Sequence, residues 1–429
     1  MTSLERIQAA LNHRQPDRTP IDFSGHRSSG IAALAYTRLR KHLALPPRPL
    51  RVYDPIQQLA IVDDDILDLF GVDTIELGRA FALDDQWWTD WELPDGTPCQ
   101  MPAWASPERD ASGDWILHGP PPARHPLGAM PREAIYFEQT RYPLASTLDT
   151  HAPADITPAL LTDALANCLW TAIASPPGPQ TPLNTPAGRT ALADGAARLR
   201  ATTDKAIIAI FGGNLFELGQ YLYRNDNFFM LLAAEPEKAH AFLDVATQLH
   251  LSNLENYLAA VGPHVDIILF GDDLGTQNGP FMSPAMYREF FKPRHALMWQ
   301  RAKQLTPHIK VQLHSCGSIR DLLPDLIEAG LDAINPVQIT CRGMDPTELR
   351  REYGRDIVFW GGGCDTRDIL PHASPAEVRA HVTRQLHTWT TPQIPSPGGY
   401  VFQQVHNIMA NVPPQNITAM FEALRETKA

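Results

Sequence analysis

Six short apolar runs in the second half of the chain each end in a Gly, Asp, Asn or His loop that leads toward a helical pattern. Runs of this length between turn residues are typical of buried strands. Strands that alternate with helices form a parallel sheet, and polar groups at the carboxyl ends of its strands mark the active face of a (β/α)8 barrel. The six runs are residues 206–211, 266–270, 308–313, 333–336, 357–360 and 400–402.

The amino-terminal part supplies the strands that complete the count. Residues 20–23, 51–54 and 72–77 are strand-like, and helical spacing separates them at 31–43 and 57–70. Two or three strands added to six give eight or nine, which fits the eight strands of a barrel. We therefore predict an α/β fold in which the whole chain, from 1 to 429, is a single (β/α)8 TIM barrel domain.

The alternation stops between residues 81 and 145, where five tryptophans are mixed with Pro, Gly and Ser turn signals. Short apolar runs between such turns predict a small antiparallel insertion within the barrel. The tryptophans either line a substrate pocket or pack the insertion onto the main body. Packing is the more common role of aromatic residues.

A net charge of -12, with no basic stripe, excludes a nucleic-acid partner. The five cysteines are too few, and odd in number, for a disulfide framework. No stretch approaches the roughly 20 apolar residues of a membrane span, and the first 18 residues, from Met1 to Arg18, do not resemble a secretory signal. These features predict a cytoplasmic protein with no membrane partner.

His314 and Cys316 follow one strand-like run, and Cys364 follows another through the Gly361–Gly363 turn. Residues two apart at a strand end project to the same side, so an imidazole and a thiolate converge there. Three N and S donors with a fourth position open are typical of a catalytic zinc. The alternative is that both cysteines are ordinary buried residues and His314 a loop histidine.

Further polar residues follow other strand-like runs on the same predicted face. Two carboxylates after residues 266–270 are candidates for a general acid, a fourth metal ligand or a partner of His314, with helix capping as the equal alternative. Four other residues are candidates for substrate binding. The carboxylates are Asp272 and Asp273, and the substrate-binding candidates are His26, Arg27, His406 and Asn407.

Several stretches resemble the uroporphyrinogen decarboxylase superfamily, within it the corrinoid-dependent methyltransferases of the methylcobamide:coenzyme M methyltransferase kind. They include PDRTPIDF, FGDDLGTQNGPFMSPAMYREFFKP, LHSCGSIRDLLPDLIEAGLDAINPVQ, FWGGGCDTRDILP and YVFQQVHNIMANVPPQNITAMFEA. The resemblance implies a barrel. It also implies a zinc bound by a His-x-Cys motif and a distant Cys, which match His314, Cys316 and Cys364.

The chain departs from the decarboxylases in the loop after its first strand, where SGHRSSG offers only Arg27 in place of an arginine-rich signature for porphyrinogen carboxylates. No Asp-x-His-x-x-Gly corrinoid motif is present, so cobalamin is expected on a separate corrinoid protein. We predict a zinc-dependent methyltransferase that moves a methyl group between this corrinoid and a small-molecule thiol or methyl donor. A tetrapyrrole carboxy-lyase and a non-catalytic binding barrel are the alternatives, and a homodimer is left open.

Overall fold

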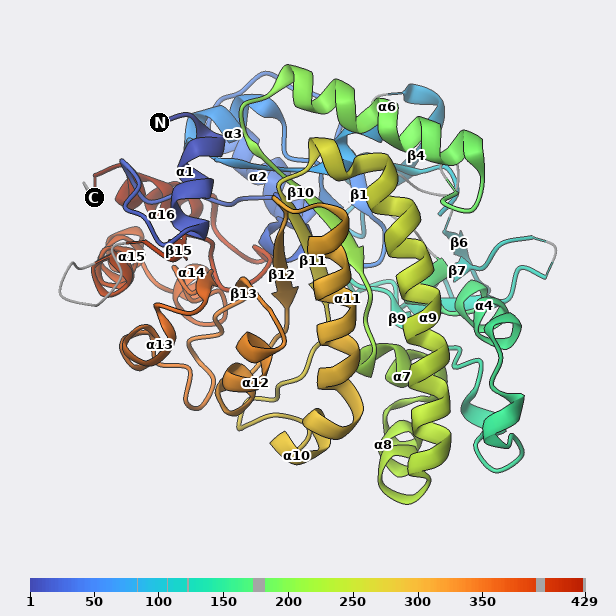
Figure 1. The fold of residues 1–429 in the computed structure, drawn as a ribbon. Helices are drawn as coiled ribbons and strands as arrows, with labels where there is room; N and C mark the ends of the chain where they lie inside the picture. The colour runs from blue at the N-terminus through green and yellow to red at the C-terminus, as the bar shows by residue number, and fades with distance from the viewer. Residues whose placement is uncertain (83, 106, 122, 173–181, 391–397, 427–429) are drawn as a thin grey trace.

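The computed structural model describes residues 1–82, 84–105, 107–121, 123–172, 182–390 and 398–426. Its centre is a parallel seven-stranded sheet, which curls round on itself (Figure 1). The strand order is β15-β14-β13-β12-β11-β10-β3. The strands are β3 (Thr74–Glu76), β10 (Ala206–Gly212), β11 (Ile267–Gly271), β12 (Lys310–His314), β13 (Ala333–Asn335), β14 (Val358–Trp360) and β15 (Tyr400–Val401).

An eighth segment, residues 20–22, lies between the two edge strands and closes the sheet. Ile21 forms a parallel bridge with Phe402, just after β15. The Asp73 N–H, just before β3, donates to the Ile21 carbonyl at 2.8 Å. Both edges of the sheet are therefore hydrogen-bonded to one short segment, as a barrel requires. The predicted α/β barrel fold is confirmed.

One predicted barrel strand lies elsewhere. Residues 52–54 form β1 (Val52–Asp54), which pairs antiparallel with β2 (Leu59–Ala60) outside the barrel. The Asp54 carboxylate accepts the N–H groups of Ile56 and Gln57 at 3.0 Å each, which turns the chain back on itself. The predicted helix over 57–70 accordingly begins only at Asp64.

Helices cover the outer face of the sheet, and the long α9 and α11 run side by side there (Figure 1). The longer helices are α1 (Ser3–Leu11), α2 (Ala33–His42), α3 (Asp64–Phe70), α4 (Pro158–Ala166), α6 (Pro186–Thr202), α7 (Phe216–Tyr223), α8 (Asn225–Ala234), α9 (Pro236–Val261), α11 (Lys292–Leu305), α12 (Leu323–Glu328), α13 (Pro346–Tyr353), α15 (Pro375–Thr390) and α16 (Pro414–Glu426). Short helices are α5 (Leu169–Ala172), α10 (Pro284–Met286) and α14 (Ile369–His372). Among the described residues, none of the helices is both long enough and apolar enough to span a bilayer.

Inward-facing side chains of the strands fill the barrel, and α1 covers its amino-terminal end. Ile208 of β10 and Trp360 of β14 belong to one buried cluster with Ile7 of α1. A capping box begins α1, because Thr2 accepts the Glu5 N–H and the Glu5 side chain accepts the Thr2 N–H. Closing this end leaves the carboxyl-terminal mouth as the accessible face.

We expect Thr2→Ala to lower the free energy of unfolding by about 1 kcal/mol, the usual contribution of an N-cap side chain. Thr2 accepts the Glu5 N–H at 3.2 Å. Urea denaturation measures the change, and Thr383→Ala, an exposed change inside α15, serves as the comparison. An unchanged midpoint for Thr2→Ala would show that α1 is held by its buried face alone.

The insertion is antiparallel, as predicted from its turns. A two-stranded sheet consists of β4 (Trp88–Glu92) and β5 (Pro98–Pro102). A four-stranded sheet consists of β6 (Glu108–Arg109), β7 (Trp115–His118), β8 (Pro126–Met130) and β9 (Glu138–Gln139). The rings of Trp91 and Trp115 lie 5.1 Å apart and pack against the insertion's own apolar cluster. For these two tryptophans the structure therefore shows the packing role.

Candidate metal centre

His314 is the last residue of β12, and Cys316 follows it at the barrel mouth. The Cys316 Sγ lies 3.5 Å from the His314 Nε2. This loop turns at Gly317, whose φ of 88° favours glycine, and a Cβ there would meet the Gly275 backbone at 2.3 Å. The loops after β12 and β11 therefore touch. Their contact brings Asp273 to Cys316, whose N–H donates to the Asp273 Oδ1 at 2.8 Å.

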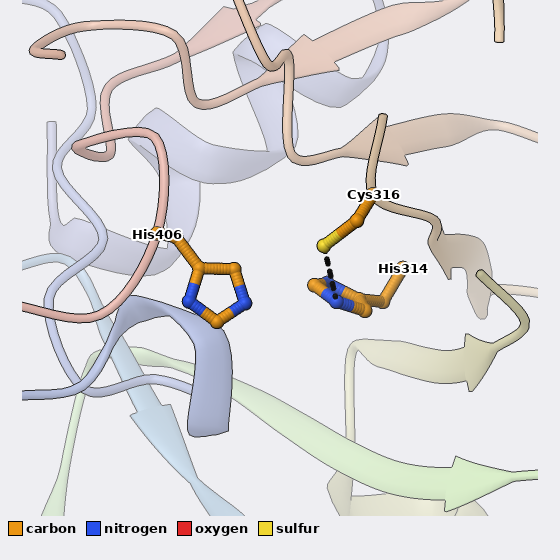
Figure 2. Close-up of side chains that lie close together, drawn as sticks. All are labelled: His314, Cys316 and His406. Carbon is orange, nitrogen blue, oxygen red and sulfur yellow. Dashed lines mark hydrogen bonds between the residues drawn. The ribbon is translucent and has the colours of Figure 1, made fainter. Parts of the chain in front are cut away.

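His406 is the third donor beside this pair. It comes from the loop after β15, and Figure 2 shows its imidazole lying across from His314 and Cys316. One ligand atom from each of His314, Cys316 and His406 lies within 4.8 Å of the others. These three residues are called the metal group below. The two imidazole rings meet edge to face, with centroids 5.7 Å apart. Sequence reasoning placed His406 on this face but expected it to bind substrate.

The spacing of this group suits a small ion with N and S ligands. Zn–S bonds of about 2.3 Å and Zn–N bonds of about 2.0 Å at a tetrahedral angle place the two ligand atoms roughly 3.5 Å apart. The observed separation of the Cys316 Sγ and the His314 Nε2 is 3.5 Å. These two atoms therefore fit adjacent corners of a zinc tetrahedron as they stand.

Cys364 is not brought into this group. Its side chain is fully buried in the apolar core between the sheet and the helices, and its Sγ contacts the Asp365 carbonyl oxygen at 3.8 Å. The turn before it contains Gly361 and Gly362 with positive φ, so the strand's alternation does not continue to Cys364. The structure thus assembles two of the three predicted metal ligands, and the third donor within reach is His406.

Asn335, at the end of β13, sets the orientation of the His314 ring. The His314 Nδ1–H donates to the Asn335 Oδ1 at 2.9 Å, which leaves the Nε2 lone pair facing Cys316. The Asn335 amide is fixed in turn, because its Nδ2 donates to the Gln403 Oε1 at 2.7 Å and to the Trp360 carbonyl at 3.2 Å. The sequence shows Asn335 at a strand end, but it does not show that His314 is its partner.

We expect Asn335→Ala to weaken zinc binding by 10–100-fold, because partners that orient metal-binding histidines contribute about this much. Competition with a chromophoric chelator measures the affinity. Asn407→Ala is the matched control. Asn407 is also a buried asparagine of the mouth, but it accepts the Gly30 N–H at 3.2 Å and donates to the Gln57 Oε1 at 3.0 Å. Equal losses in both variants would contradict an orienting role.

The network continues from Asn335 to the first barrel segment. The Ser28 hydroxyl donates to the Asn335 Oδ1 at 3.0 Å and lies 2.9 Å from the His26 Nδ1. The His26 Nε2 lies 3.1 Å from the Asp22 Oδ2. Burial opposes ionisation of Asp22, but His26 and hydrogen bonds to the carboxylate hold its pKa below the usual value. His26, predicted to bind substrate, is 1% exposed and takes part in this network.

Burial controls the protonation of the donors. It lowers the pKa of His314 against the opposing effect of Asp273, and it lowers the pKa of His406 to about 3, where the neighbouring imidazoles of His314 and His26 also oppose a positive charge. Both imidazoles are therefore neutral, which is their ligand form. Burial, with Asp273 and Glu217, raises the pKa of the Cys316 thiol well above its usual value. Without a metal ion this sulfur is a thiol, and coordination to a cation would deprotonate it.

The two predicted carboxylates have different surroundings. Asp272 is fully buried, and its oxygens accept the N–H groups of Leu215, Phe216 and Glu217 at the start of α7, at 2.9 to 3.3 Å. These contacts are those of the helix-capping alternative. Asp273 is half-buried, with its Oδ1 3.6 Å from the His314 Nε2, and keeps its place among the catalytic candidates.

Glu217, in the first turn of α7, was not found from the sequence. Its carboxylate accepts hydrogen bonds from Tyr221 and, at 2.6 Å, from the Asn214 amide. Burial, then the charges of Asp273 and Asp272, raises the pKa of Glu217 to about 8. The metal group therefore lies beside an acid that keeps its proton at neutral pH.

The remaining candidates face other partners. The Arg27 Nε lies 3.6 Å from the Asp54 Oδ2, with the guanidinium side chain 30% exposed. Asn407 joins the loop at Gly30 to Gln57, as described above. Neither residue is a member of the metal group.

Residues 183–427, more than half of the chain, match the uroporphyrinogen decarboxylase (URO-D) family. The chain belongs to this family. A methylated-thiol–coenzyme M methyltransferase of Methanosarcina mazei is 33% identical over 148 residues, which are 34% of this chain and 35% of that protein. The match thus spans about a third of that relative.

A solved structure described as a methyltransferase from Methanosarcina mazei matches over the full length of both chains, with a TM-score of 0.54 and 15% identity. At this identity the likeness concerns the fold. It agrees with the closed parallel barrel of this member of the URO-D family. Both of these similar proteins are described as methyltransferases.

Proposed function

We propose that this URO-D family member is a zinc-dependent methyltransferase that moves a methyl group between a corrinoid on a separate protein and a small-molecule thiol or methyl donor. The observation that carries the proposal is the convergence of His314, Cys316 and His406 at the barrel mouth. The name of the curated relative, a methylated-thiol–coenzyme M methyltransferase, supports the reaction class.

The residues present fit zinc. Two neutral imidazoles and one thiol are donors that this ion prefers, and three protein ligands leave a position for substrate. In our proposal His314, Cys316 and His406 hold the metal, and Asn335 keeps the His314 ring turned toward it. When bound, zinc supplies Lewis acidity, which lowers the pKa of a thiol or polarises an ether oxygen or amine.

The chain's own acids complete the chemistry in this proposal. Asp273 holds the Cys316 loop through the Cys316 N–H at 2.8 Å. Glu217, whose pKa is raised to about 8 by burial and the two aspartates, carries a proton at neutral pH. It is placed to hand that proton to a leaving oxygen or nitrogen.

Metal analysis and a methyl-transfer assay test the proposal together. We expect one zinc per chain. We also expect the zinc-loaded protein to demethylate free methylcobalamin with at least one thiol of a panel, which the loss of the methylcobalamin absorbance measures. The same protein treated with a chelator is the control. Turnover of uroporphyrinogen by metal-free protein would establish the carboxy-lyase alternative instead.

A further inference from the structure

The two ends of α7 are held by different parts of the molecule. At its start the barrel holds it, because Asp272 accepts its first N–H groups. At its end the insertion holds it. The Tyr221 carbonyl accepts the Gln139 amide of β9 at 2.7 Å, and the Leu222 carbonyl accepts the Leu144 N–H at 2.8 Å. The terminal N–H and C=O groups of a helix have no partners within it, so these contacts fix α7 between the barrel and the insertion.

Tyr221 lies one helical turn after Glu217, so the two side chains share one face of α7. The Tyr221 hydroxyl donates to the Glu217 Oε1. The Asn214 amide donates to the Glu217 Oε2 at 2.6 Å. Each oxygen of this carboxyl group therefore has its own donor, and the group cannot turn without losing one of them.

The ring of Tyr221 is supported by Trp170 of α5. The two rings are stacked, with their centroids 5.8 Å apart and their planes at 22° to each other. Trp170 packs in turn against the apolar cluster of the insertion. A stacked partner restricts rotation of the phenol ring, and this keeps its hydroxyl at Glu217.

Titratable groups from three elements face Glu217. They are Asp272 and Asp273 after β11, Cys316 after β12, and Tyr221 in α7 itself. Burial and the two aspartates disfavour the carboxylate, whereas the hydrogen bonds from Tyr221 and Asn214 favour it, and together they set the pKa of Glu217 at about 8. A general acid is most effective when its pKa lies near the working pH. The Tyr221 hydroxyl thus counteracts part of the effect of burial on this acid.

We propose that Tyr221 is a positioning residue for the acid Glu217, and that the insertion, through Trp170, holds Tyr221 in place. As a role in proton delivery, the proposal rests on the proposed function, in which Glu217 supplies the proton. As support of one carboxyl group, it depends on neither metal nor substrate. In this way the insertion contributes to the site without supplying a reacting group.

Infrared titration of chelator-treated protein follows the proton of Glu217 directly. The C=O band of the protonated carboxyl group, identified by its loss in Glu217→Gln, should disappear with a midpoint at about pH 8 in the wild type. Tyr221→Phe keeps the ring and its stacking but removes the hydroxyl. Its midpoint should rise by about one pH unit, a tenfold change in the protonation equilibrium, because a hydrogen bond that favours the carboxylate is lost.

Tyr223→Phe is the matched control. Tyr223 lies in the same helix and is 1% exposed, and its hydroxyl has no hydrogen bond within the described part of the chain. Its loss should leave the midpoint unchanged. Trp170→Leu removes the stacked ring and should raise the midpoint in the same direction as Tyr221→Phe, whereas Trp170→Phe should restore it.

Circular dichroism checks that each variant is folded. A wild-type midpoint in folded Tyr221→Phe, or an equal rise in Tyr223→Phe, overturns the positioning role. A wild-type midpoint in Trp170→Leu overturns the role of the insertion, and if this variant does not fold, the comparison of Tyr221→Phe with Tyr223→Phe still decides the positioning role. Because neither metal nor substrate is present, failure of methyl transfer would contradict the proposed function and leave this result standing.

Discussion

Cys316→Ser is expected to abolish stoichiometric zinc binding and to lower the rate of methyl transfer by about 1,000-fold or more, while the barrel stays folded. Serine keeps the size of the side chain but offers a much poorer ligand for zinc than a thiolate. Loss of a Lewis acid is worth several kcal/mol, and ~4 kcal/mol corresponds to a factor of about 1,000 in rate. Elemental analysis and the methylcobalamin assay measure the two effects.

The structure indicates that the fold should tolerate this change. Cys316 lies in a loop at the mouth, half-buried, and is absent from the apolar core clusters. Cys168→Ser is the matched control, since Cys168 is fully buried in the core and contacts the Gln139 Oε1 at 3.2 Å, outside the metal group. This control should keep zinc and activity but lose some stability. Full zinc occupancy in Cys316→Ser would remove the thiol from the proposed site.

The barrel strands were predictable because each is defined by its own local sequence. Residues 206–211, 333–336 and 357–360 are apolar, β-branched or aromatic runs that end at turn residues, and β10, β13 and β14 occupy these positions. Such signals do not specify the partner strand. Residues 52–54 form a strand, but Asp54 turns the chain into a hairpin outside the barrel.

The candidate site was predictable only where two residues share one strand end. His314 and Cys316 are two positions apart after β12, so their closeness follows from the alternation of a strand. The side chains of Cys364 and His406 lie in loops after other strands, and their orientations depend on how those loops fold. Gly361 and Gly362 have positive φ and turn the chain before Cys364. Side chains do not alternate regularly through such a turn, so the sequence does not predict where Cys364 points. Contacts such as those of Asn335 with Gln403 join separate strands and leave no local pattern.

The second large effect concerns zinc affinity, which should depend on which residue is the third metal donor. The family motif implies Cys364, whereas the structure places His406 with His314 and Cys316. If His406 is the donor, His406→Ala should weaken zinc binding by at least about 100-fold, because two protein ligands remain in place of three. Cys364→Ser should retain zinc and lower only the free energy of unfolding, by about 1–3 kcal/mol, since a hydroxyl replaces a thiol in the apolar core.

X-ray absorption of the zinc-loaded wild type answers the same question without a substitution. One sulfur at about 2.3 Å is expected for His314, Cys316 and His406, and two sulfurs are expected if Cys364 takes part. Cys364 is 0% exposed and lies in the core cluster, so its participation would require the loop after β14 to turn this side chain out toward the mouth. Two sulfurs, together with zinc lost from Cys364→Ser and kept by His406→Ala, would show that metal binding remodels this loop.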